Sequence, residues 1–241
     1  MDVSNATVLV TGANRGIGRC IVDCLLAAGA PRIHAAARDP AKLGERAGNP
    51  RIVPLALDVT RPEQVARAVE CCVDVTLLIN NAGVNRNRPL IGEPEALANA
   101  RAEIEVNYLG TLAMCRAFAP VLEANGGGTI VNVLSAIARV NLPALGSYAA
   151  SKAAAYSMTQ GVRAELAGQG TRVIGVLPGA VDTDMTPGGD ARPEDVAAAV
   201  VEAIAGDVED LYPDAMARGI AEGLAKDAKA VERELAAFLP G

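Results

Sequence analysis

Aromatic residues and histidine are scarce in this chain. Its 241 residues include no tryptophan, two phenylalanines, four tyrosines and one histidine, His34. A single histidine excludes any mechanism that needs two imidazoles, and we expect His34 to be an ordinary strand residue near a sheet.

Basic runs and long apolar runs are also missing. The formal charge is -6 and the charged residues are scattered, so the electrostatic footprint of a nucleic-acid-binding protein is absent. No apolar run approaches the length of a membrane span, and residues 1–6 lack the basic region of a targeting signal. These observations predict a cytoplasmic protein with neither a nucleic-acid nor a membrane partner.

Cysteines are few and odd in number. Of the five, Cys20, Cys24, Cys71 and Cys72 fall in segments with a helical pattern. Cys20 and Cys24 share a helical face, but no second pair stands at metal-ligand spacing, so we interpret the cysteines as reduced core thiols. The sequence therefore predicts no metal site.

Strand-like and helix-like segments alternate along the chain. Predicted strands cover residues 7–10, 33–37, 52–57, 75–79, 129–133 and 172–177, and predicted helices cover 17–28, a short stretch near Ala41, 63–72, 95–123, a segment around Tyr148, and 193–204. Continuously apolar strands such as 75–79 indicate burial on both faces. We therefore expect an α/β fold with a doubly wound, mostly parallel sheet and helices on both faces, formed by residues 1–241 as a single domain.

The C-terminal part departs from this alternation. Residues 184–192 form a short loop, residues 210–212 are the remnant of a last strand, and the alanine-rich segment 213–239 is expected to form one or two helices.

A glycine-rich turn joins the first predicted strand to the first helix. Gly12, Gly16 and Gly18 stand in a G-x-x-x-G-x-G pattern, where missing side chains let backbone amides approach a phosphate. The alternative is a tight turn without a ligand.

The residues after the second strand indicate which dinucleotide is bound. An acid that selects NAD through its ribose 2′-hydroxyl is expected at the strand end, but Arg38 stands there. Together with Arg15 in the glycine turn, Arg38 provides two cations suited to a 2′-phosphate, which favours NADP(H). The alternative is a solvated Arg38, with Asp39 bonded to the ribose of NAD.

Polar residues also follow the third and fourth strands, where ligands of open α/β sheets gather. Asp58 precedes Val59 and is suited to the adenine amino group, and it can at the same time cap the helix that starts at Arg61–Pro62. Asn80–Asn81–Ala82–Gly83 ends the fourth strand.

Tyr148 and Lys152 are the most informative pair, because they place a phenol and an ammonium one turn apart on one helix face. Along with the glycine turn, Asn107, Ser135 and Pro178–Gly179–x–Val181–x–Thr183, they stand in the order and spacing of the short-chain dehydrogenase/reductase family. The chain resembles that family from Thr7 to about Thr183.

The resemblance implies the roles of the site residues. Tyr148 is the general acid in reduction and the base in oxidation, and Lys152 and the oxidised nicotinamide favour its ionised form. Lys152 also holds the nicotinamide ribose, Ser135 orients the substrate carbonyl, and the Asn107 side chain supports a water. The implied cofactor-binding residues are Gly12, Asn14, Arg15, Gly16, Ile17, Gly18, Arg38, Asp58, Val59, Asn81, Ala82, Gly83, Tyr148, Lys152, Pro178, Gly179, Val181 and Thr183.

The chain also departs from the family's pattern. The short segment 184–192 implies an open substrate site, with Met185 as one wall, and the loop 84–93 carries Arg86 and Arg88, which flank the same mouth or are simply solvated. The weak last strand puts a tetramer in doubt, whereas the helices around Asn107 and Tyr148 are the family's commoner dimer surface. We expect a homodimer or homotetramer.

The sequence therefore predicts an oxidoreductase that moves a hydride between NADP(H) and a small-molecule carbonyl or alcohol substrate, in the reduction of a ketone or aldehyde. Two alternatives stand beside it: an NAD-dependent alcohol dehydrogenase, and a cofactor-binding sensor or scaffold without turnover.

Overall fold

A parallel sheet organises the molecule. The structure, a computed structural model, describes residues 1–86, 89–91 and 94–239. In this part of the chain seven strands pair in the order β3-β2-β1-β4-β5-β6-β7, and every pairing is parallel. The strands are Thr7–Thr11 (β1), Arg32–Ala37 (β2), Ile52–Ala56 (β3), Leu77–Asn80 (β4), Gly128–Val133 (β5), Thr171–Val176 (β6) and Asp210–Leu211 (β7). The predicted doubly wound α/β fold is confirmed.

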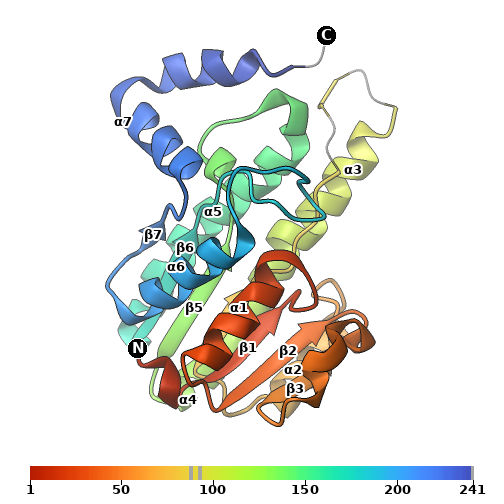
Figure 1. The fold of residues 1–241 in the computed structure, drawn as a ribbon, viewed down its shortest axis with the longest axis vertical. Coiled ribbons are helices and arrows are strands. Elements are labelled where there is room, and N and C mark those ends of the chain that lie inside the picture. The colour runs from red at the N-terminus through yellow and green to blue at the C-terminus, as the bar shows by residue number, and fades with distance from the viewer. Residues whose placement is uncertain (87–88, 92–93, 240–241) are drawn as a thin grey trace.

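Helices cover both faces of this sheet. The α-helices in the described part of the chain are Gly16–Ala27 (α1), Pro62–Cys71 (α2), Ala96–Glu103 (α3), Thr111–Ala124 (α4), Gly146–Leu166 (α5), Pro193–Ala205 (α6) and Ala215–Ala236 (α7). Figure 1 shows α1 and α6 in front of the sheet and α4 behind it. Val8 and Val10 join the core with α1 and α6, whereas Leu9 joins the core with α2 and α4, because alternate strand residues point to opposite faces.

The predicted long helix 95–123 is not uniform. It consists of α3, a π-helical segment Ile104–Gly110, and α4. Asn107 lies in the π-helical segment and is buried. Such wide turns recur at functional sites, and the apolar spacing that predicted the helix does not report them.

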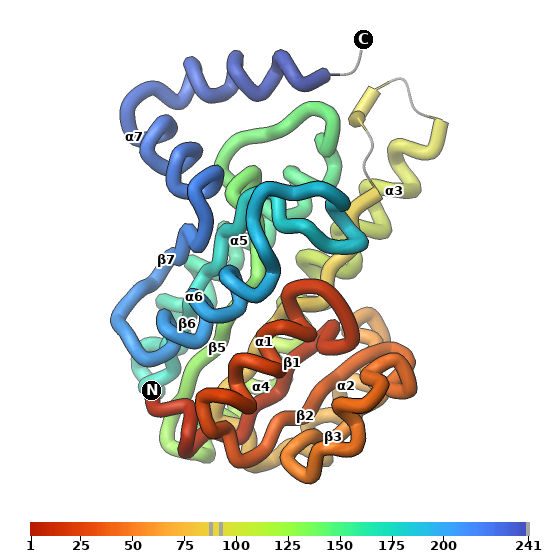
Figure 2. Tube along the Cα trace, in the orientation of Figure 1, coloured from red at the N-terminus to blue at the C-terminus, as the bar shows by residue number. Residues whose placement is uncertain are grey.

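The C-terminal segment forms two helical pieces rather than one straight helix. The backbone of Asp227 is non-helical, and its carboxylate accepts a hydrogen bond from the Ala230 amide at 2.9 Å, which starts the second piece of α7. Figure 2 shows this piece running across the end of the molecule, above the other helices in that view. The predicted strand remnant is also confirmed, because β7 pairs with Gly175 and Val176 of β6.

The cysteines are all free thiols, but they do not all lie in the core. Cys20, Cys72 and Cys115 are buried, Cys24 is half-buried, and Cys71 is exposed, so the core interpretation is wrong for Cys71. Within the described ranges, no group of histidine, cysteine and acidic residues is arranged to hold a metal ion. In those same ranges no helix is long and apolar enough to cross a membrane.

Candidate active site

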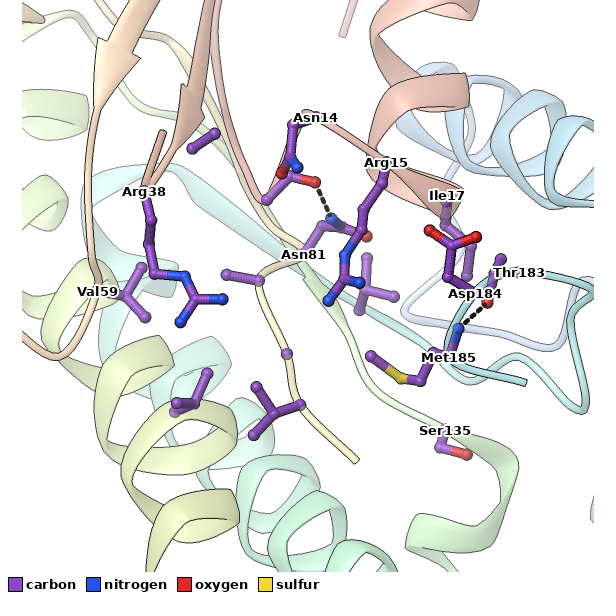
Figure 3. Close-up of a pocket in the computed structure, with 18 of the residues that line it drawn as sticks. Asn14, Arg15, Ile17, Arg38, Val59, Asn81, Ser135, Thr183, Asp184 and Met185 are labelled. Atoms are coloured by element: carbon purple, nitrogen blue, oxygen red, sulfur yellow. Dashed lines mark hydrogen bonds between the residues drawn. The ribbon is translucent and has the colours of Figure 1, made fainter. Parts of the chain in front are cut away.

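A cavity of about 780 Å³ opens at the carboxyl ends of the strands (Figure 3). It is lined by every predicted cofactor-binding residue except Gly18, and by Ser135 of the predicted catalytic set; Asn107 does not line it. Ligands of open α/β sheets bind at this edge. The chain thus brings together residues far apart in sequence, from the glycine turn to Thr183, around one space.

Gly18 acts through packing rather than by facing the cavity. A Cβ at this position would lie 2.2 Å from Asn81 Nδ2 and 2.4 Å from the Gly12 carbonyl oxygen, closer than any side chain tolerates. The same Asn81 amide donates to the carbonyls of Thr11 at 3.0 Å and Gly12 at 3.1 Å. Asn81 therefore fixes the shape of the glycine turn, and Gly18 makes room for it.

Three cationic side chains line one part of the cavity. They belong to Arg15, Arg38 and Lys42, all exposed, and within the described residues none forms an ion pair with a carboxylate. Figure 3 shows the Arg15 and Arg38 side chains pointing into the pocket. Asp39 lines the cavity too, but one of its oxygens accepts from the Ala41 amide at 3.1 Å and caps a short 3-10 helix. This cluster is suited to a phosphate group, and its third cation, Lys42, was not predicted from the sequence.

Asp58 does not cap the helix that follows it. One carboxylate oxygen accepts from the Thr60 amide at 3.0 Å and from the Thr60 hydroxyl at 2.7 Å, whereas the N-cap position of α2 is Arg61, whose side chain makes no capping hydrogen bond. The capping interpretation is therefore wrong, because Asp58 closes a local turn instead. Burial raises the pKa of this carboxyl, but the Thr60 hydrogen bonds and the Arg38 charge outweigh it and leave the pKa below its usual value.

Tyr148, Lys152 and Ser135 converge at the other part of the cavity. Lys152 Nζ lies 5.8 Å from the centre of the Tyr148 ring and donates to the Val133 carbonyl at 2.8 Å. The Ser135 hydroxyl donates to the Pro178 carbonyl at 3.4 Å, and it lies close enough to the Tyr148 hydroxyl to lower the pKa of that phenol. Two hydroxyls and an ammonium thus face one space, which is suited to exchanging a proton with a bound oxygen.

Burial dominates the ionisation of this group. It raises the pKa of Tyr148 to about 12, while the Ser135 hydrogen bond lowers that pKa and the Glu103 charge raises it. Burial also lowers the pKa of Lys152 to about 8. Together, burial and the side chains around Tyr148 therefore do not lower its pKa, contrary to the expectation from Lys152. The phenol is in its protonated, acid form at neutral pH.

Asn107 ties the π-helical segment to two other elements. Its Oδ1 accepts from the Val84 amide, and its Nδ2 donates to the Val84 carbonyl and the Ser151 hydroxyl, each at 2.9 Å. Both hydrogens and one acceptor site of the side chain are used by the protein. Only the second lone pair of Oδ1 remains for the water that the resemblance implied.

The loop after β6 is held by the start of α7, which the sequence analysis missed. Asp214 Oδ2 accepts from the Gly179 amide at 2.8 Å, its Oδ1 caps α7 at the Ala217 amide at 2.9 Å, and Met216 Sδ lies 3.4 Å from the Ala180 amide nitrogen. The acid before an alanine-rich segment is a visible cap signal. The contact with Gly179, 35 residues away, leaves no local pattern.

The short segment after Thr183 folds back on itself. The Asp182 amide donates to the Ala191 carbonyl at 2.8 Å, and the Asp182 carboxylate accepts from the Gly188 amide at 2.9 Å. Met185 lines the cavity, as predicted. Arg86 is not among the lining residues, and Arg88 lies outside the described residues.

Comparing substitutions of Asp214 and Asp227 distinguishes the loss of a helix cap from the loss of the hydrogen bond to the Gly179 amide. We expect Asp214→Ala to lower the free energy of unfolding by about 1 kcal/mol for the lost cap, plus about 1–2 kcal/mol for the unpaired Gly179 amide, and to raise the KM for the nucleotide. Asp227→Ala removes a comparable cap within α7, far from the loop, so it should cost only the capping energy. Thermal melts and nucleotide KM values of both variants test this, and equal KM values would contradict the role of Asp214.

The fold and the cavity are those of a nucleotide-binding oxidoreductase. Residues 6–193 match the sequence profile of the family described as short chain dehydrogenase. The chain belongs to the short-chain dehydrogenase/reductase family. Among curated proteins, it is 35% identical over 211 residues to the short chain dehydrogenase mpl6 of Monascus purpureus, covering 81% of this chain and 70% of that relative.

Solved structures of the family are similar over most or all of the chain. A short chain dehydrogenase of Burkholderia cenocepacia J2315 in complex with NADP is 47% identical, with a TM-score of 0.92 and full coverage of both chains. A 3-ketoacyl-(acyl-carrier-protein) reductase of Brucella melitensis complexed with NADH is 26% identical, with a TM-score of 0.77 and coverage of 87% of this chain and 97% of that one. These relatives thus bind different nicotinamide dinucleotides.

Proposed function

We propose that this protein is an NADPH-dependent carbonyl reductase that converts a ketone or aldehyde to an alcohol, and that runs in reverse when alcohol is supplied. The observation that carries the proposal is one cavity with Tyr148, Lys152 and Ser135 in one part and the cations Arg15 and Arg38 in another. The similar structure with bound NADP also supports it.

The residues present fit a dinucleotide with a 2′-phosphate, because the cations of the cavity form no ion pair with a carboxylate among the described residues. Arg15, Arg38 and Lys42 hold that phosphate, and the loop around Thr183 holds the nicotinamide carboxamide. When bound, NADPH supplies the hydride.

The proton is handled by this chain's own side chains. Tyr148 gives its phenolic proton to the carbonyl oxygen, and Ser135 donates a hydrogen bond that orients that oxygen. Lys152 keeps two hydrogens beyond its bond to the Val133 carbonyl, and it uses them for the nicotinamide ribose.

A panel of ketones and aldehydes tests the proposal. The purified protein is mixed with NADPH and each compound, and loss of NADPH absorbance is followed. We expect at least one carbonyl compound to be reduced, and no consumption with any member of a broad panel would contradict the proposal.

Two other functions remain as competitors. An NAD-dependent alcohol dehydrogenase is favoured by Asp39, which lines the cavity, and by the relative complexed with NADH. A sensor or scaffold without turnover is disfavoured by the complete set Asn107, Ser135, Tyr148 and Lys152. Comparing the rates with NADPH and with NADH distinguishes the NAD-dependent alcohol dehydrogenase from the proposed reductase. The panel of carbonyl compounds distinguishes the sensor or scaffold, which would reduce none of them.

A further inference from the structure

Two matching hydrogen-bonded pairs join the helix containing Asn107 to α5. Asn107 donates to the Ser151 hydroxyl, and Glu103, one turn earlier, accepts from the Ser147 hydroxyl. Ser147 precedes Tyr148 in the chain, as Ser151 precedes Lys152. Each reactive residue of α5 is therefore adjacent to a serine fixed from the neighbouring helix.

The same two side chains also hold the loop after β4. Asn107 bonds the amide and carbonyl of Val84 at 2.9 Å each, and Glu103 Oε1 accepts from the Arg86 amide at 2.7 Å. Asn107 belongs to the family's catalytic set, but Glu103 makes the equivalent contacts one turn away without being part of it.

Glu103 is an unusual residue for this place. Its relative exposure is 0%, and burying a carboxylate is costly unless hydrogen bonds compensate. An apolar residue would fill the space without that cost, so the carboxylate is expected to serve a purpose that requires its two acceptor oxygens.

We propose that Glu103 is a positioning residue for Tyr148, holding the first turn of α5 against the loop that follows β4. This inference rests on the proposed function, in which the Tyr148 hydroxyl must meet a substrate oxygen. Small errors in such placement reduce rates strongly.

The Glu103 charge has a second, measurable consequence. Among the residues that the structure describes, the charged groups beside Tyr148 are Lys152 on its own helix and Glu103 from α3. Its other polar neighbour is Ser135, and the hydroxyl of Tyr212 in the adjoining apolar cluster is bonded to Arg139 at 2.7 Å. A negative charge raises the pKa of a phenol, so removing the Glu103 charge lowers the pKa of Tyr148.

Glutamine and alanine at position 103 separate these effects. Glu103→Gln keeps both contacts, because its oxygen accepts from the Arg86 amide while its nitrogen donates to Ser147. We expect kcat to stay within a few-fold of wild type and the pKa of Tyr148 to move down, because the negative charge that raises it is gone. Glu103→Ala loses both contacts, and kcat should fall by about 10- to 100-fold with NADPH affinity unchanged.

The titration is read without turnover. The near-ultraviolet absorbance of phenolate is recorded against pH for the full chain with NADP+ bound. For the wild type and for each Glu103 variant, the curve of the same protein carrying Tyr148→Phe is subtracted, which leaves the titration of Tyr148. This signal remains measurable if no carbonyl compound is reduced, so failure of the proposed function is distinguishable from failure of this inference.

Glu123→Gln, an exposed carboxylate on α4, is the matched control and should change neither readout. If Glu103→Ala does not fold, Ser147→Ala replaces it and should also lower kcat. A Glu103→Gln titration that coincides with wild type, or wild-type kcat in the alanine variants, would overturn the proposal.

Discussion

Tyr148→Phe should lower kcat for carbonyl reduction by about 10²- to 10⁴-fold, the usual contribution of a positioned acid or base. The substitution removes only the hydroxyl that faces Ser135, and the ring keeps its place in the apolar cluster at the start of α5. NADPH affinity should therefore stay nearly unchanged. Steady-state kinetics with the best carbonyl substrate and a fluorescence titration of NADPH measure the two quantities.

The same helix offers a matched control. Tyr156 lies farther along α5, and its hydroxyl donates to Asp210 of β7 at 2.7 Å, away from the cavity. Tyr156→Phe should leave kcat within a few-fold of wild type. Tyr148→Phe with wild-type kcat would refute the acid role, whereas equal losses in both variants would indicate a general effect on α5.

Arg38→Asp should reverse the coenzyme preference. The substitution removes a cation from the pocket and introduces an acid suited to the ribose 2′-hydroxyl of NADH. Losing one charge-assisted hydrogen bond costs about 1.5–3 kcal/mol, which is about 10- to 100-fold in NADPH affinity, and repulsion between the new carboxylate and the 2′-phosphate adds to it. Lys42→Ala should weaken NADPH binding by less and leave NADH binding unchanged.

Arg67→Asp controls for the change of net charge. Arg67 is exposed on α2 and does not line the cavity, so this variant alters the overall charge equally without touching the proposed phosphate site. We expect its NADPH and NADH dissociation constants to match wild type. An Arg38→Asp protein that still prefers NADPH would instead point to Arg15 and Lys42 as sufficient, and would contradict the role given to Arg38.

The sheet was predictable because strands buried on both faces carry their signal locally. The apolar run that ends at Ile79, for example, belongs to β4 at the centre of the sheet. The turn at Gly12 was visible for a similar reason, since glycines at close spacing between a strand and a helix can be recognised from neighbouring residues alone.

Contacts between distant segments were not predictable in this way. Three features depend on how helices and loops pack against one another. They are the kink at Asp227, the hydrogen bond between Asp214 and the Gly179 amide, and the hydrogen bond between Glu103 and Ser147. The π-helical turn around Asn107 is a further case, because its apolar spacing fits an ordinary helix equally well.

The ionisation of Tyr148 shows why a motif does not give a pKa. The neighbouring ammonium of Lys152 suggested an acidic phenol, but the pKa of Tyr148 is set mainly by burial, which raises it to about 12. The depth of burial depends on the packing of α5 and α7 around the ring, which residue spacing does not report.

Transfer of deuterium tests the central claim most directly. NADPH deuterated on the transferable side of nicotinamide C4 is incubated with the protein and a carbonyl compound accepted in the panel, and the alcohol is analysed by mass spectrometry. We predict one deuterium on the carbinol carbon with wild-type protein and almost none with Tyr148→Phe in the same time. Alcohol that forms without the label, or labelled alcohol at equal rates from both proteins, would contradict hydride transfer assisted by this phenol.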